Sequence, residues 1–431
     1  MLGTKRVTSV LLVVFVLLSV VSHLGAVNAK PKTIVVPDDY NDIQEAINNA
    51  NPGDTVYVKN GTYYFEGPST ETPLDGITIN KSISLIGESS QSTIFMPKYK
   101  WTGRLRSFIH VIADNVLISG FTMIGTIEEV QYRDMARKFT GYVQRGIFLH
   151  TTDFVSPDPQ GCKIIGNIFI GYNSEAIGDN SKGAIISENQ FLHEPKSSNG
   201  ISLTYASDTI IVNNTFYSNG IGVGESENIT IKQNQIIGGG FDNTTTQGHA
   251  TISLGGKKIY FYENNITNCG VGISFSGITN CQIYNNTIAN NKLGIILRNY
   301  ISNTDNSLDN SNIVYHNDFL NNENHVFVDN TYFSHISPVS GNTTDTVLWD
   351  YNKIGNYWDD YDGKDSNQDK IGDIPYVFDV KNQDNYPLME QFEFIEIKTN
   401  PSTECPFWLV ILTAAVIICA TAMIYLKTQK K

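Results

Sequence analysis

The sequence is poor in cysteine and in positive charge. Its 431 residues include 5 Cys, and 30 Lys and Arg stand against 43 Asp and Glu, which gives a formal net charge of −13. So few cysteines do not make a disulfide framework. The negative charge argues against general nucleic-acid binding, which needs a basic surface. It suits a soluble surface protein or one that meets cations.

The cysteines are also poorly placed for pairing. Cys162 and Cys281 hold equivalent strand positions in separate repeats, and Cys405 and Cys419 lie in the tail. Cys269 and Cys281 are close enough in the chain to pair, but we expect one strand plus a turn to hold them too far apart.

The groupings that carry metal or acid–base chemistry are missing as well. The 8 His and 6 Met are scattered without ligand spacing, whereas copper needs His, Met or Cys grouped in space. No pair of acids recurs on successive strands, and glycoside hydrolysis needs convergent carboxylates. We expect the lone residues Asp179 and Arg298 to be structural. These absences favour a protein without catalytic activity.

What the sequence has in abundance is a short repeat between Ile164 and Leu320. Each copy is an apolar strand, an Asn, one spacer residue and another apolar residue. The Asn recurs at steps of 22, 25, 20, 30, 22 and 31 residues, which is a basal period with insertions. The repeated residues are Asn167, Asn189, Asn214, Asn234, Asn264, Asn286 and Asn317.

The residue types within the repeat predict a parallel β-helix. β-branched and aromatic residues alternate with polar ones, which is strand periodicity. A second apolar run, such as Gly146–Leu149, precedes each Asn strand, and a short third run follows the Asn. We therefore expect an all-β, single-stranded parallel β-helix of about ten coils, each with three short strands.

The recurring Asn has two physical explanations. Asn tolerates the left-handed backbone conformation that a sharp bend between strands needs. Its amide also has donors and acceptors, so stacked Asn side chains can bond along a ladder. We predict a structural Asn ladder and no catalytic role.

The N-terminal region carries two further signals. Residues 1–29 are typical of a secretory signal peptide, because Lys5 and Arg6 precede the apolar run Val10–Val21. An uncleaved anchor is the alternative. Residues 30–65 are expected to cap the open end of the solenoid. Asp38 or Asp39 can cap a short helix with the apolar face Ile43, Ala46 and Ile47.

The C-terminal region ends in an apolar run. Residues 407–426 are about twenty mostly apolar residues without a charge, enough to span a bilayer. Lys427, Lys430 and Lys431 follow, which places the tail in the cytoplasm by the positive-inside rule. A buried core helix is the alternative.

Four stretches resemble a known family. The stretch IVVPDDYNDIQEAINNANPGDTVYVKNGTYY resembles the opening of pectin-lyase-like right-handed β-helix proteins, and more closely that of the NosD-type family of archaeal and bacterial surface or periplasmic proteins. SISLIGE and ADNVLISGFTMIG resemble the next coils, and GNYWDDYDGKDSNQDKIGDIPY resembles the family's ending. The resemblance covers nearly all of residues 33–390. It implies a right-handed β-helix and says little about activity, because such coils host many functions.

The repeat, the termini and the resemblance together divide the chain. The expected parts are a signal peptide (1–29), an N-terminal cap (30–65), β-helix repeats (66–345), a C-terminal cap with an acidic Asp/Asn loop (346–390), a connector (391–404), a transmembrane helix (405–426) and a cytoplasmic tail (427–431). This describes a single-pass membrane protein whose β-helix is extracellular or periplasmic.

Two basic, aromatic segments interrupt the repeat, residues 97–106 and 126–145. Both fall between the third strand of one coil and the first strand of the next, so they should project from one flank of neighbouring coils. Arg and Lys can bind carboxylates or sulfates there, and aromatic rings can support sugars. The alternative is that both loops only cover a flank of the core. The candidate glycan-binding residues are Lys98, Lys100, Trp101, Arg104, Arg106, Tyr132, Arg133, Arg137 and Lys138.

The acidic loop of the C-terminal cap resembles the start of an EF-hand calcium loop. Oxygen-bearing side chains fall at spacings of two, two and four residues, as hard cations require. However, Lys370 stands where such loops have Gly, and Tyr376 stands where they have a bidentate Glu. Ca²⁺ is therefore a candidate cofactor beside the alternative of a solvated acidic turn. The candidate ligands are Asp365, Asn367, Asp369, Ile371 and Asp373.

Three functions follow from these observations. The favoured one is a cell-surface, membrane-anchored module that binds carbohydrate or builds the envelope without catalysis. One alternative is an extracellular polysaccharide lyase or hydrolase. The other is the copper-related maturation role that the NosD-type resemblance implies. The expected partners are a surface polysaccharide and the membrane, with no nucleic acid, and several Asn-x-Ser/Thr acceptors fit a glycoprotein.

Overall fold

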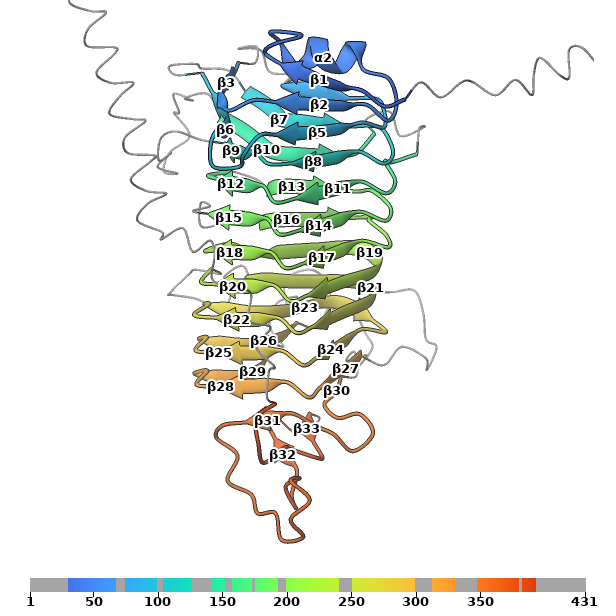
Figure 1. Cartoon of the computed structure of the whole chain (residues 1–431). Coiled ribbons are helices and arrows are strands. Elements are labelled where there is room, and N and C mark those ends of the chain that lie inside the picture. Colours follow the sequence, from blue (N-terminus) through green and yellow to red (C-terminus); the bar gives the residue numbers. More distant parts are fainter. Residues whose placement is uncertain are drawn as a thin grey trace, which may run out of the picture. The chain divides into compact units, whose positions relative to one another are not determined.

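The described part of the chain is a stack of β-strand coils (Figure 1). The computed structural model describes residues 30–66, 74–98, 104–125, 142–151, 157–172, 175–192, 199–239, 250–298, 312–329, 347–379 and 382–392. All of them belong to one compact unit, Met1–Phe392. The predicted signal peptide, transmembrane helix and tail lie outside these residues. No helix within the described ranges is long and apolar enough to cross a membrane.

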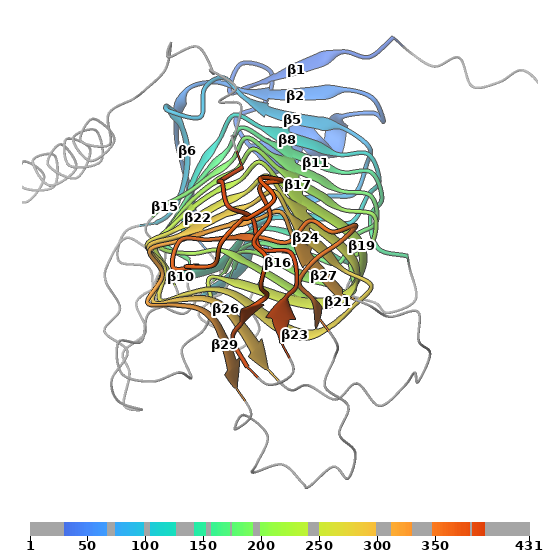
Figure 2. The same ribbon diagram turned by 90° about the horizontal axis from the view of Figure 1, so that it is seen from below.

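The strands form a 20-stranded and an 11-stranded parallel sheet. The larger sheet holds two strands of each coil, here called columns A and B, and the smaller sheet is column C. Figure 2 looks along the stack and shows the three columns on different sides of the coil. In β19 (Ile221–Lys232) and β21 (Ile252–Tyr262), columns A and B are joined in one long strand. The predicted all-β architecture of parallel strands is confirmed, with three strands per coil.

The strands of each column follow one another along the chain. Column A contains β4 (Ile77–Ile79), β7 (Arg104–Val111), β10 (Tyr142–Leu149), β13 (Glu175–Asp179), β16 (Asn199–Thr204), the starts of β19 and β21, β23 (Val271–Thr279), β26 (Leu293–Arg298) and β29 (Asn324–Asp329). Column B contains β1 (Thr33–Val36), β2 (Thr55–Val58), β5 (Ser84–Gly87), β8 (Leu117–Ser119), β11 (Lys163–Ile165), β14 (Ile185–Ser187), β17 (Ile210–Val212), the ends of β19 and β21, β24 (Gln282–Tyr284), β27 (Asn312–Tyr315) and β30 (Val347–Leu348).

Column C supplies one strand to each of the eleven coils it joins. It contains β3 (Gly61–Phe65), β6 (Thr93–Pro97), β9 (Thr122–Ile124), β12 (Ile168–Ile170), β15 (Gln190–Leu192), β18 (Thr215–Tyr217), β20 (Gln235–Ile237), β22 (Asn265–Thr267), β25 (Thr287–Ala289), β28 (Asp318–Leu320) and β31 (Tyr357–Trp358). The short antiparallel pair β32 (Tyr376–Val377) and β33 (Gln383–Asp384) follows in the C-terminal cap.

The core is built of side-chain rows that run along the stack. In column C, Phe169, Phe191 and Phe216 are fully buried and stack with ring centroids 5.1 and 4.6 Å apart. Each such side chain stabilises the fold by about 1.5–3 kcal/mol through burial. The row ends where Trp358 stacks on Phe319 at 4.2 Å, so Trp358 closes the last coil.

The N-terminal end is closed by α2 (Ile43–Asn49), which buries Ile43, Ala46 and Ile47 as predicted. The predicted N-cap was wrong: Asp42 caps the helix by accepting a bond from Glu45 N at 2.9 Å. Asp39 instead closes the turn after β1, because its carboxylate accepts from Val35 N at 2.7 Å.

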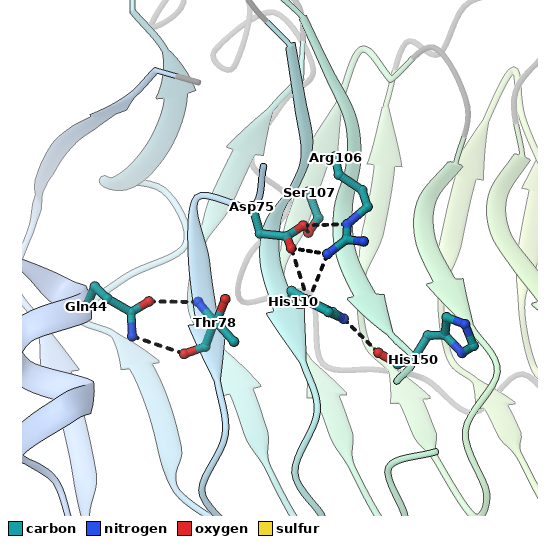
Figure 3. A network of polar contacts seen from close by, with 7 residues as sticks. All are labelled: Gln44, Asp75, Thr78, Arg106, Ser107, His110 and His150. Carbon is teal, nitrogen blue, oxygen red and sulfur yellow. Dashed lines mark hydrogen bonds and ion pairs between the residues drawn. The ribbon is translucent and has the colours of Figure 1, made fainter. Parts of the chain in front are cut away.

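The same helix covers the exposed edge of β4. The Gln44 amide accepts a hydrogen bond from Thr78 N at 2.7 Å and donates one to Thr78 O at 3.1 Å (Figure 3). These are the bonds that another strand would make, so the side chain satisfies an edge that would otherwise attract a foreign strand.

The Asn ladder is confirmed at the corner between columns B and C. The main-chain N and Nδ2 of each ladder Asn donate to Oδ1 of the Asn in the next coil; from Asn189 to Asn214 these distances are 3.0 and 3.1 Å. Nδ2 also donates back to a strand carbonyl, as from Asn189 to Ile164 O at 2.9 Å. The ladder extends beyond the predicted set to Asn356, which accepts from Asn317.

The backbone reason given for the recurring Asn was wrong. Positive φ belongs to the residue before each ladder Asn, for example Glu188 at 57° and Gln233 at 56°. The ladder Asn residues themselves do not have it. Because the residue before the Asn makes the bend, hydrogen bonding along the ladder is the reason why the repeat needs Asn.

The three described cysteines, Cys162, Cys269 and Cys281, are free and buried. Cys269 and Cys281 do not pair, as expected. Burial raises the pKa of each thiol to about 11, so these thiols are unreactive packing groups.

Candidate functional site

The two predicted glycan-binding segments precede neighbouring strands. β7 and β10 pair in parallel in column A, as expected for loops on adjacent coils. Lys98 is exposed and pairs with Glu66 at 3.0 Å, and Arg106 lies in β7. The side chain of Arg104 is not among the described groups. Outside the described residues lie Lys100, Trp101, Tyr132, Arg133, Arg137 and Lys138.

A cluster of charged groups and rings lies on the outward face of column A around β7 and β10 (Figure 3). It is half-buried or buried, and its cations, imidazoles and carboxylates contact one another. We call it the column A cluster. Its members are Asp75, Arg106, Ser107, His110, Arg145, Phe148, His150, Asp158 and Glu175.

A break in the strand alternation creates this cluster. A Cβ at Gly146 would lie 2.8 Å from the buried Phe169 ring, so Gly146 faces the interior. The next residue, Ile147, is also fully buried. Two consecutive inward positions leave Arg145 and Phe148 both on the outer face, although simple alternation would put Arg145 on the same side as Ile147.

Asp75 holds one end of the cluster together. Its carboxylate accepts bonds from Arg106 Nε at 3.0 Å and Ser107 Oγ at 2.6 Å, and it lies 3.1 Å from His110 Nδ1. Burial alone would raise the pKa of Asp75, but the hydrogen bonds from His110, Arg106 and Ser107 outweigh it and hold that pKa well below its ordinary value. Asp75 is therefore ionised, and it fixes the Arg106 side chain.

Two histidines flank the Phe148 ring. The His110 ring stacks on Phe148 at 5.6 Å, and the His150 ring lies 5.3 Å away. His110 Nε2 donates to His150 O at 2.6 Å, because a carbonyl can only accept. His150 Nδ1 lies 2.7 Å from Asp158 Oδ1, which also accepts from Thr151 N. The contact with His150 O thus fixes the His110 ring, and the contact with Asp158 fixes the His150 ring.

Arg145 has donors that no described residue accepts. Its Nε pairs with Glu175, and its guanidinium carbon lies 4.5 Å from the Phe148 ring centroid. The side chain lies against Gly178, where a Cβ would be 3.1 Å from Arg145 Cδ and Nε. The Arg145 side chain is 23% exposed, and its two terminal NH₂ groups bond to none of the described residues. It can therefore offer a two-pronged donor to an incoming anion.

Small residues continue the outward face beyond Phe148. The residues in register with Phe148 on the next four strands of column A are Gly178, Ser202, Gly222 and Ser253. Ser202, Gly222 and Ser253 are half-exposed. Coils are spaced by about 4.8 Å, so these positions form a polar track of about 10 Å beside the cluster, with the Asn199 side chain against Gly222.

The described carboxylates of the cluster are not arranged as a glycoside hydrolase needs. Asp75, Asp158 and Glu175 each contact an arginine or an imidazole rather than a second carboxylate. Hydrolysis of a glycosidic bond needs two carboxyl groups that face each other across it. The arrangement suits anion binding better than hydrolysis.

A second group of ligand-type side chains lies at the C-terminal cap. His325 Nε2 is 2.9 Å from Asp359 Oδ1 and 3.3 Å from Asp360 Oδ1. Tyr376 OH donates to Asp360 at 2.8 Å. Within the described ranges, this is the group of three His, Cys, Asp or Glu side chains close enough to hold a metal ion.

The predicted calcium loop directs its carboxylates at its own main chain. Asp365 accepts from Asp369 N at 3.2 Å and Lys370 N at 2.8 Å, and Asp373 accepts from Ser366 N at 3.1 Å. The described carboxylates of the loop form no group of three within 4.8 Å. Lys370 has φ 69°, the left-handed conformation that calcium loops give to Gly. Calcium binding by Asp365, Asn367, Asp369, Ile371 and Asp373 stays a prediction.

Several members of the column A cluster were missed from the sequence. Arg145 falls within the segment 126–145 that was singled out, but it was not chosen as a ligand. Phe148 lies on β10, His110 lies on β7 and His150 directly follows β10, and none of the three was chosen as a ligand. The adjacent Gly146 and Ile147 were the available signal, because neither is polar and a strict alternation would place one of them outside.

The sequence model of the family described as "Periplasmic copper-binding protein (NosD)" matches residues 129–363. A cell surface glycoprotein of Methanothermus fervidus is 27% identical over 433 residues, which cover 92% of this chain. The chain spans 63% of that relative, less than two thirds of its length.

Two solved structures are similar at low identity. The A-module of mannuronan C-5 epimerase AlgE6 from Azotobacter vinelandii is 15% identical with a TM-score of 0.48, and covers 71% of this chain and 94% of its own. A polygalacturonase from Erwinia carotovora ssp. carotovora is 13% identical with a TM-score of 0.43, and covers 71% and 96%. Neither likeness carries an inference about substrate or chemistry.

Proposed function

The chain belongs to the NosD family, described as periplasmic copper-binding proteins, and from that premise we propose an exported surface protein that binds acidic carbohydrate without catalysis. The periplasmic family and the cell surface glycoprotein relative support a location outside the cytoplasm. The signal peptide at 1–29 and the membrane helix at 405–426 belong to the proposal, because they explain export and attachment.

The observation that carries the proposal is the Arg145 guanidinium. It is partly exposed, it lies on Phe148, and its terminal NH₂ groups bond to none of the described residues. Planar guanidinium groups bind carboxylates and sulfates through two parallel hydrogen bonds. A cation held rigidly by Glu175 and Phe148 loses little side-chain entropy when it binds.

The neighbouring surface favours a sugar over a small inorganic anion. The polar track of Ser202, Gly222 and Ser253 continues from the cluster along the stack. Serine hydroxyls can meet sugar hydroxyls there, and the Asn199 amide, which lies against Gly222, offers further donors and an acceptor. Arg106 bonds to Asp75 through both Nε and a terminal nitrogen, whereas Arg145 bonds to Glu175 through Nε, so Arg145 keeps more donors for a ligand.

One observation favours a second candidate function. The His150–Asp158 pair is an imidazole oriented by a carboxylate at 2.7 Å, and it lies on the same face as Arg145. A uronate lyase needs a cation for the uronate carboxylate and a base for the sugar proton. Release of unsaturated sugar ends from a uronate polymer would establish that activity, whereas binding without release supports the proposed function.

A binding comparison tests the proposal. The full-length protein is titrated with oligogalacturonate and with a neutral glucan of equal length, first unaltered and then as Arg145→Gln. Hydrogen bonds to a charged group contribute about 1.5–3 kcal/mol, so the affinity of Arg145→Gln for oligogalacturonate should fall at least about tenfold. Lys258→Gln is the matched control, because Lys258 is an exposed cation paired with Glu227.

The comparison of the two variants distinguishes a site at Arg145 from a general effect of net charge. Equal losses in Arg145→Gln and Lys258→Gln would show that only the net charge matters, which contradicts a site at Arg145. The absence of binding to any acidic polymer on a glycan array would refute carbohydrate binding and leave the envelope scaffold.

A further inference from the structure

A second, shorter asparagine ladder runs along the corner between columns C and A. Cys269 N donates to Asn291 Oδ1 at 2.8 Å. Asn291 N and Nδ2 donate to Asn322 Oδ1 at 3.0 and 2.9 Å. Asn322 Nδ2 donates back to Ile288 O at 2.8 Å. This ladder has the same direction as the first, with its N–H groups pointing toward the C-terminal cap.

His325 takes the place of the next asparagine in this ladder. Its Nδ1 lies 3.1 Å from Asn322 Nδ2. The orientation of the Asn322 amide is fixed by main-chain groups, because Oδ1 faces the N–H of Asn291 and Nδ2 faces the carbonyl of Ile288. An N–H can only donate and a carbonyl can only accept. The group that Asn322 presents to His325 is therefore a donor, and His325 Nδ1 must accept.

The proton of the neutral imidazole consequently sits on Nε2. From there it points to Asp359 Oδ1 at 2.9 Å and Asp360 Oδ1 at 3.3 Å. A metal-bound histidine nitrogen must offer a lone pair instead of a proton. Metal binding at Nε2 would move the proton to Nδ1, where it would face the N–H of Asn322. An imidazole and two carboxylates are ligand types that Cu²⁺ can accept. However, the proton on Nε2 occupies the lone pair that the ion would need.

The first ladder ends in a similar way. Asn356 N donates to Asp384 Oδ2 at 2.6 Å, and Trp358 Nε1 donates to the same oxygen at 3.0 Å. Both ladders therefore end on carboxylates of the cap, the second one through an imidazole.

We propose that His325, Asp359 and Asp360 are the hydrogen-bonded end of the second asparagine ladder and not a copper site, although the family is described as copper-binding. His325 is a positioning residue that joins the last coil to the acidic segment of the cap. This account is independent of carbohydrate binding at column A.

A glutamine substitution at His325 distinguishes the end of a hydrogen-bonded ladder from a copper site. In His325→Gln, the side-chain oxygen can accept from Asn322 and its NH₂ can donate to Asp359, so the ladder is kept while the imidazole is lost. The melting temperature of the full-length His325→Gln protein should stay within about 2 °C of the unaltered protein. That of His325→Leu should fall further, because the Asn322 donor loses its acceptor and the two carboxylates lose the imidazole N–H.

Metal binding is measured on the same proteins with Cu²⁺ as the probe. The copper stoichiometry of the full-length protein should be the same in the unaltered chain, in His325→Gln and in Asp359→Asn/Asp360→Asn. Nitrogen NMR of the unaltered protein should show the His325 proton on Nε2. The proposal is overturned if Cu²⁺ raises the melting temperature of the unaltered protein but not of His325→Gln, or if the proton is on Nδ1.

Discussion

At the scale of single residues, one amide group explains why asparagine recurs at the corner between columns B and C. Its main-chain N–H and Nδ2 both reach Oδ1 of the next coil, and Nδ2 also reaches a strand carbonyl; for Asn234 these bonds are 2.9 to 3.1 Å long. The bend itself is made by the residue before, which takes positive φ. Gly, Asn, Glu, Gln and His all occupy that bend, whereas the ladder position keeps Asn.

Removal of one ladder amide should therefore cost more than removal of a neighbouring polar side chain. In Asn234→Ala, the buried N–H groups of Asn214 lose their acceptor. An unsatisfied buried group costs about 1–3 kcal/mol, so we expect the free energy of unfolding in urea to fall by about 3 kcal/mol. Gln235→Ala, an exposed change on the following strand, should stay within about 0.5 kcal/mol. Similar losses for both variants would contradict the role of the ladder.

A buried carboxyl near the end of the stack should make stability depend on pH. Burial raises the pKa of Asp318 from 3.8 to about 6, against the opposing bond from Phe392 N. The folded state thus holds a proton that the unfolded chain loses first. Its stabilising contribution is complete below pH 3.8 and is lost as the pH rises through about 6. The free energy of unfolding of Asp318→Asn should fall less over this window than that of the unaltered protein. Parallel profiles would exclude Asp318 as the group responsible.

At the scale of elements, the strand repeat could be predicted and the site could not. Alternating residues around Asn189 or Asn286 indicate strand, corner and strand directly, because burial in a β-helix follows period two. At β10, Gly146 and Ile147 both face inward, so a strict alternation misplaces Arg145. Contacts such as Arg145 with Glu175 join residues 30 positions apart, and no local pattern reveals them. The helix N-cap was misplaced because three nearby Asp residues can all cap.

The glycine beside Arg145 offers a test at this scale. A Cβ at Gly178 would lie 3.1 Å from Arg145 Cδ and from Phe148 Cδ2. Gly178→Val should therefore displace the Arg145 side chain and lower the affinity for oligogalacturonate about as much as Arg145→Gln does. Gly224→Val is the control on the same column, because a Cβ there meets only Leu203 O at 3.8 Å. A loss of affinity in Gly224→Val alone would place binding elsewhere on the face.

The acidic loop of the cap gives a prediction about metal removal. If Asp365, Asn367, Asp369, Ile371 and Asp373 bind Ca²⁺, millimolar calcium should raise the melting temperature and a chelator should lower it, since an ion that binds only the folded state stabilises it by mass action. Asp369→Asn should weaken this response. A melting temperature that is the same with calcium and with chelator would show that the loop is a solvated acidic turn.

At the scale of the whole solenoid, both ends of the stack are closed by side chains that imitate or terminate its hydrogen bonds. Gln44 bonds to the main chain of β4 at the N-terminal end. Asp384 and His325 receive the last donors of the two ladders at the other end. A stack closed in this way presents its outward faces as a fixed surface, and the outward face of column A carries the Arg145 guanidinium and the polar track.

Hydrogen exchange of the full-length protein, with and without oligogalacturonate, tests this account most directly. Binding at column A should slow amide exchange in β10, β13 and the adjoining part of β16, and leave the tyrosine-bearing strands β24 and β27 of column B unchanged. Protection on column B or C, or no change at saturating ligand, would contradict a carbohydrate site at Arg145.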